Sequence, residues 1–138
     1  MKISKIYFVI AIIAVAVLSR LVPHPPNFTP ITAIALFSII NLKNKYLALS
    51  VPLICLFISD LILGISLINL FVYFSFILIS TAGYFFEKIN LTSVLSSSLI
   101  FFTVTNFGVW LIGYPNTFEG FIACYIAALP FFGWTIAG

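Results

Sequence analysis

The sequence predicts an all-α membrane protein, a polytopic helix bundle with five complete transmembrane helices and a partial or truncated sixth. Hydrophobic residues make up 63% of the 138 residues and charged residues only 7%, and the mean hydropathy is +1.27. This composition leaves too little polar surface to cover a water-soluble globule, so we expect the chain to contact the lipid bilayer. At about 20 residues per crossing, residues 1–138 form a single integral-membrane domain with no room for a soluble one.

Each predicted helix is an apolar run bounded by charged or turn-forming residues. In chain order the runs cover residues 6–22, 29–42, 46–63, 67–86, 93–112 and 120–138. The second run is short and follows a proline-rich segment. In the last run, Pro130 removes a backbone donor and clashes with the preceding turn, which predicts a half-helix over residues 121–129. Because the chain stops at Gly138 without a polar tail, we also expect the sixth helix to be cut short.

The basic residues predict which end of the bundle faces the cytoplasm, because cytoplasmic loops carry an excess of Lys and Arg. With the N-terminus inside, Arg20 is the one basic residue outside, against five inside: Lys2, Lys5, Lys43, Lys45 and Lys88. These charges are spread over short loops, so they indicate topology and no nucleic-acid partner. A cleaved signal peptide is the competing interpretation of residues 1–19, but its removal would break this charge pattern.

This topology brings three polar segments to the outer face of the membrane: residues 20–32, 59–69 and 103–119. Asp60 is the one acid well inside an apolar run, where an unpaired carboxylate is costly. Arg20, at the outer end of the first helix, is its natural partner by depth. The pair is either a structural lock between the first and third helices or part of a ligand site, and the two roles are compatible.

The segment VPHPPNFTPIT, residues 22–32, is a stiff connector because its four prolines fix their own backbone and restrict the residue before each. It is either a rigid linker or a wall that holds His24, Asn27 and Thr29 in place for hydrogen bonding with little loss of entropy. His24 is the single histidine, so no second imidazole can help it hold haem or zinc. We therefore predict neither a metal nor a cofactor.

Polar residues also recur at helical spacing on the fourth and fifth helices. Asn106, Trp110 and Tyr114 share one face of the fifth, as Asn69 and Tyr73 do on the fourth. A buried carboxamide needs several partners, whereas Trp and Tyr near a helix end also mark the membrane interface. The predicted ligand-binding residues are Arg20, His24, Asn27, Asp60, Asn69, Asn106, Trp110 and Tyr114.

The succession SRLVPHPPNFTPITAIALF, SDLILG, TNFGVWL and CYIAALPFF resembles an uncharacterised bacterial family of small membrane proteins. That family is similar to the substrate-binding S components of energy-coupling factor (ECF) transporters. The resemblance implies an inner-membrane location, six helices, a pocket that opens outward, and a scaffold subunit and two ATPases as partners. The chain lacks a phosphate-binding GxxxxGK[ST] loop, as expected if separate ATPase subunits bind the ATP. Its first helix lacks the AxxxA docking motif of many S components and has Ala11, Ala14 and Ala16 instead.

The leading hypothesis is therefore a membrane subunit, not an enzyme, that binds a small-molecule micronutrient for uptake. It predicts that Asp60→Asn abolishes uptake and leaves a folded protein. The alternative is a structural or assembly protein of the cell envelope without transport activity. A third hypothesis, an intramembrane enzyme with His24 and Asp60 as base and orienter, has only Cys55 as a candidate nucleophile.

Overall fold

The computed structural model describes residues 3–138 and contains six α-helices there. Lys2, one of the five lysines in the topology count, lies outside the described residues. The helices are α1 (Ile3–Leu21), α2 (Ile31–Asn41), α3 (Lys45–Leu63), α4 (Leu67–Ala82), α5 (Leu91–Gly113) and α6 (Phe118–Ala137), with a 3-10 turn, η1 (Gly83–Phe85), after α4. The predicted all-α class is confirmed.

Five of the six helices are long and apolar enough to cross a membrane, which makes this a multi-pass membrane protein. The exception is α2, whose 11 residues span about 16 Å of a hydrocarbon core about 30 Å thick. The connection from α1 to α2 must therefore cover part of the remaining depth. Irregular backbone is stable at such depth only where protein buries it or where it lines a cavity.

The sixth helix differs from the prediction of a half-helix, because α6 continues through Pro130 for 20 residues. A proline removes one N–H from the helical ladder, whereas a break would leave several backbone groups without partners in an apolar environment. A continuous helix therefore loses fewer backbone hydrogen bonds than a broken one. The same holds for α3, which contains Pro52. The short helix of the bundle is thus α2, which the sequence also predicted to be short.

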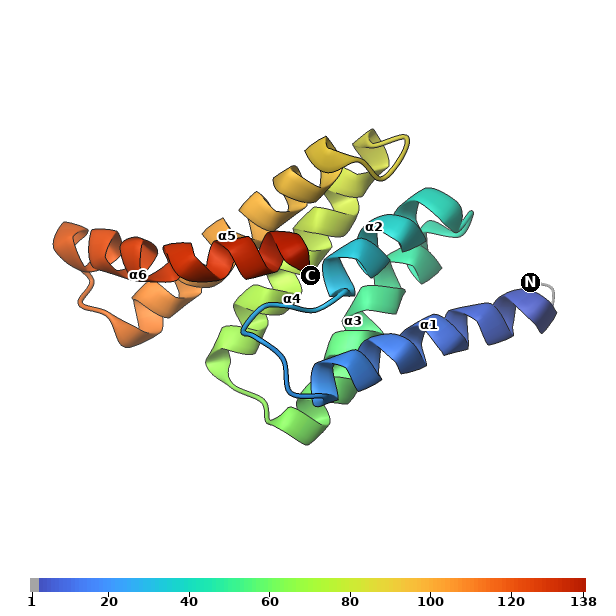
Figure 1. The fold of residues 1–138 in the computed structure, drawn as a ribbon, viewed down its shortest axis with the longest axis horizontal. Coiled ribbons are helices and arrows are strands. Elements are labelled where there is room, and N and C mark those ends of the chain that lie inside the picture. The colour runs from blue at the N-terminus through green and yellow to red at the C-terminus, as the bar shows by residue number, and fades with distance from the viewer. Residues whose placement is uncertain (1–2) are drawn as a thin grey trace.

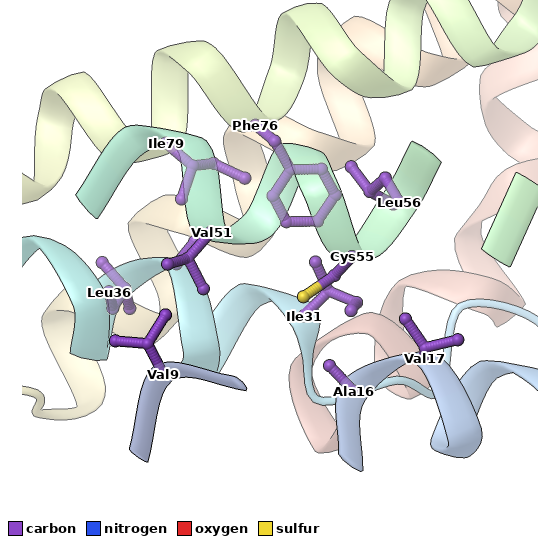
Figure 2. Packing of buried hydrophobic residues seen from close by; sticks show 11 residues of the cluster. Val9, Ala16, Val17, Ile31, Leu36, Val51, Cys55, Leu56, Phe76 and Ile79 are labelled. Carbon is purple, nitrogen blue, oxygen red and sulfur yellow. The ribbon is translucent and has the colours of Figure 1, made fainter. Parts of the chain in front are cut away.

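The core lies where α1, α2 and α4 pack around α3 (Figure 2). Its buried side chains are mostly small or branched: Val9, Ala16 and Val17 of α1, Ile31, Ala35 and Leu36 of α2, Val51, Cys55 and Leu56 of α3, and Phe76 and Ile79 of α4. The second half of the molecule is α5, packed on α4, with α6 packed on α5. In Figure 1 the C-terminal end of α6 reaches the start of α2.

Candidate functional site

An ion pair joins α1 to α3, as the sequence predicted. Nη1 of Arg20 lies 2.8 Å from Oδ1 of Asp60, and Asp60 is buried, with 2% of its surface exposed. Arg20 also donates from Nη1 to the Leu56 carbonyl at 3.3 Å and to the Ser59 hydroxyl. A buried carboxylate is stable only when charge and hydrogen bonds compensate its lost hydration, and this geometry supplies both.

The second oxygen of Asp60 ties α3 to α4. Oδ2 accepts hydrogen bonds from the Asn69 amide at 2.7 Å and from the Tyr73 hydroxyl at 2.8 Å. Asn69 in turn accepts hydrogen bonds from the backbone N–H and the hydroxyl of Ser66, the N-cap of α4. Both carboxylate oxygens therefore have protein partners, so Asp60 connects three helices and offers little to a ligand.

Arg20 differs from Asp60 because part of its guanidinium group has no protein partner. The three contacts above all use Nη1. Among residues 3–138, no group accepts a hydrogen bond from Nε or Nη2. The side chain lines a cavity together with residues of the connection between α1 and α2. Arg20 is thus fixed by Asp60 on one side and presents donors on the other.

The proline-rich connection forms a tight turn with Asn27 near its tip. The Phe28 N–H donates to the Pro25 carbonyl at 3.0 Å, and Asn27 has a φ of 64°. Proline at the second position and a positive φ at the third define a type II turn, and asparagine tolerates that conformation better than most residues. His24 lies before the turn, with Nδ1 3.0 Å from the Pro25 carbonyl.

Two adjoining cavities lie inside this frame. One, of about 150 Å³, is lined by Arg20, His24, Asn27, Thr29, Thr32, Leu56, Leu63, Val72, Phe76, Phe101 and Thr135. The other, of about 140 Å³, is lined by Asn27, Ile68, Val72, Phe101, Phe102, Thr105, Asn106, Val109, Phe131 and Thr135. Asn27 and Thr135 line both. Together the cavities approach the lower end of ligand-pocket volumes, about 300 Å³.

The eight predicted residues fall into three groups: those that line the cavities, those that hold Arg20, and those at the C-terminal end of α5. Arg20, His24 and Asn27 line the first cavity, and Asn27 and Asn106 line the second. Asp60 and Asn69 hold Arg20 in position from α3 and α4.

Trp110 and Tyr114 line neither cavity. Trp110 donates to the Pro115 carbonyl at 3.1 Å and packs edge-on against Phe121. Tyr114 ends α5 as its C-cap. Both therefore lie at the corner between α5 and α6.

Thr135 is a cavity residue that the sequence did not point to. It belongs to the last turns of α6, and the predicted break at Pro130 removed that segment from consideration. The continuous helix carries Thr135 to the proline-rich connection, where neighbouring Trp134 packs edge-on against Phe28.

Tyr73 was visible in the sequence as the residue one turn after Asn69. Its spacing was the signal that could have placed it beside Asp60.

The cavities are equipped for hydrogen bonding. Their polar lining consists of one guanidinium, one imidazole, two carboxamides and four threonine hydroxyls. Among residues 3–138, no three His, Cys, Asp or Glu side chains converge in a way that could hold a metal ion. Cys55, the one candidate nucleophile, is fully buried in the apolar core. This arrangement suits reversible binding of a small polar molecule.

The fold and cavities thus define a multi-pass helical membrane protein with two small cavities between its helices, lined by both polar and apolar side chains. Within that class, the chain belongs to a family of unknown function, DUF6580, whose model matches residues 1–138. No curated protein and no solved structure matches the chain.

Proposed function

We propose that this protein is a substrate-binding membrane subunit for uptake of a small polar micronutrient, comparable to the S components of ECF transporters. The observation that carries the proposal is Arg20, whose Nε and Nη2 have no protein partner among residues 3–138 and whose side chain lines the first cavity. The Arg20 side chain is 17% exposed, so a molecule in the cavity can reach these donors. A bound solute would accept hydrogen bonds from them in place of water.

The chemistry of the solute follows from the charge around Arg20. Asp60 already compensates the guanidinium charge, so a ligand need not bring a full negative charge of its own. A carbonyl, carboxylate or ring nitrogen can accept from the free donors. Asn27 and Asn106 each offer a carboxamide that both donates and accepts. The solute we propose is therefore small, with at least one strong acceptor and further polar groups.

The proline-rich connection supports a binding role because its shape is set in advance. The type II turn fixes Asn27 between the two cavities, so binding orders little additional chain. The proposal includes a bacterial inner-membrane location and a cytoplasmic N-terminus, which place this connection on the outer face. It also includes an ECF-type transmembrane scaffold and ATPases as partners.

A structural role in the envelope is the second candidate, and the completeness of the Asp60 network favours it. All four side chains in that network would be needed simply to join α1, α3 and α4. This candidate leaves two features without purpose: the free donors of Arg20 and the polar lining of the cavities.

The two candidates are separated by native mass spectrometry of the tagged protein, released gently from its own host's membranes. We expect a stoichiometric small molecule bound to the wild type. Asn27→Gly should lose it, because glycine keeps the positive φ of the turn and removes the carboxamide. Asn116→Gly, an exposed position in the turn before α6, is the matched control and should retain it.

Absence of any small molecule from the folded wild type, or equal retention by Asn27→Gly, would contradict the binding role. Co-release of a scaffold and ATPases would support the coupling. An envelope complex without nucleotide-binding subunits would support the structural role.

A further inference from the structure

A second cavity system lies on the outside of the bundle, between α1 and α2. These helices each pack mainly on α3 and touch one another little. Two apolar cavities of about 380 and 350 Å³ occupy the space between them. They are lined by Phe8, Ala11, Ile12 and Val15 of α1, by Pro30, Ala33, Ile34 and Phe37 on the α2 side, and by Ile89.

The lining residues form one continuous groove. On α1, Phe8, Ile12 and Val15 recur every three or four residues and so share one face. Ala33 and Phe37 do the same on α2. Phe8 and Phe37 meet across the groove, with ring centroids 6.1 Å apart. Because Phe8 lines both apolar cavities, they join into a single trough rather than two separate hollows.

One end of the trough is polar and basic. Phe8 also lines a cavity of about 690 Å³ whose other lining residues are Lys5, Asn41, Leu42, Lys43, Asn44 and Leu47. Both lysines are exposed, and the one ion pair among residues 3–138 involves neither. The groove therefore has a cationic mouth at the N-terminal end of α1 and an apolar floor beyond it.

The length of the groove matches one leaflet of a bilayer. From Lys5 to Val15 is ten residues of helix, which is about 15 Å. Half of the hydrocarbon core is also about 15 Å. A molecule whose head lies at the lysines and whose tail follows the groove would thus end near the bilayer midplane, at Pro30.

We propose that this groove binds one anionic phospholipid, with its phosphate at Lys5 and Lys43 and an acyl chain between α1 and α2. The charge at the mouth selects an anionic headgroup, since each lysine near the surface adds to the attraction. The apolar floor, whose residues are exposed or half-buried on α1 and α2, suits a lipid tail. The inference does not depend on the proposed function, because it involves none of the residues around Arg20 except the shared connection at Pro30.

The test is lipid retention measured by native mass spectrometry after reconstitution in nanodiscs that contain phosphatidylcholine and phosphatidylglycerol in equal amounts. We expect the wild type to retain one phosphatidylglycerol in preference to phosphatidylcholine. Lys5→Gln/Lys43→Gln should weaken that retention tenfold or more. Lys45→Gln/Lys88→Gln removes the same charge from the same end of the bundle outside the groove, and should leave retention unchanged.

A second variant tests whether an acyl chain occupies the groove between α1 and α2. Ala33 is exposed in the apolar floor, so Ala33→Trp should fill it and expel the lipid without loss of folding. Equal losses in both lysine pairs, equal retention of the two lipids, or unchanged retention in Ala33→Trp would each overturn the proposal.

Discussion

Asp60→Asn is the substitution whose effect the structure specifies most fully. The asparagine would keep the size of the side chain but replace one acceptor oxygen with an NH₂ group. Three donors, from Arg20, Asn69 and Tyr73, converge on the carboxylate within 2.8 Å, so at least one of them would face another donor. The Arg20 charge would also lose its counter-ion.

The expected cost follows from the burial of the pair. Removing one partner of a buried ion pair typically lowers the free energy of unfolding by about 3–5 kcal/mol. With 2% of Asp60 exposed, water cannot replace the lost interactions. This revises the sequence-based expectation that Asp60→Asn leaves a folded protein and affects uptake alone. An unfolded Asp60→Asn variant would also lose uptake, so loss of uptake in this variant does not identify Asp60 as a ligand-binding residue.

The assay is reversible unfolding in mixed micelles, with Glu119→Gln as control. Glu119 is the exposed acid in the first turn of α6, where neutralising it should cost about 0.3–1 kcal/mol through the helix dipole alone. The double variant Arg20→Met/Asp60→Leu removes both charges and should recover about 2 kcal/mol of the loss. A loss below about 1 kcal/mol for Asp60→Asn, or no recovery in the double variant, would refute the reasoning.

Two paired substitutions test the helix packing by the same unfolding assay. The hydroxyl of Ser97 is buried without a partner among residues 3–138, so Ser97→Ala should leave stability unchanged or raise it by up to ~1 kcal/mol. Ser93→Ala should lower it by ~1 kcal/mol, because Ser93 completes the capping box of α5; equal effects would be evidence against both assignments. A methyl group at Gly108 would collide with the ring of Phe71, so Gly108→Ala should cost ~1–3 kcal/mol. Gly133→Ala meets open space and should stay within ~0.5 kcal/mol of wild type, and a similar loss in both would contradict the close approach of α4 and α5.

The helices and the ion pair could be predicted from the sequence because a bilayer leaves few alternatives. Every backbone group must be satisfied within a helix, so long apolar runs became long helices. A lone acid in an apolar run needs a cation at its own depth, and Arg20 was the one basic residue assigned to that end.

What the sequence did not reveal depends on how helices pack across the bundle. The path of α6 could not be read from Pro130, since the penalty for one missing hydrogen bond must be compared with that of a break in the surroundings of the helix. Thr135 was therefore missed. Trp110 and Tyr114 share a face of α5 with Asn106. Residues on one helix face still lie at different heights along the helix axis, so they need not reach the same cavity. Asn106 meets the cavity, whereas the two aromatic residues lie beyond it.

The most direct test of the account is an experimental density map of the protein purified from its own host's membranes. The account predicts non-protein density in the cavity beside Arg20, within about 2.7–3.2 Å of its Nη2 or Nε and of the Asn27 carboxamide. A cavity that holds only water, with Arg20 turned away from it, would contradict a ligand site there.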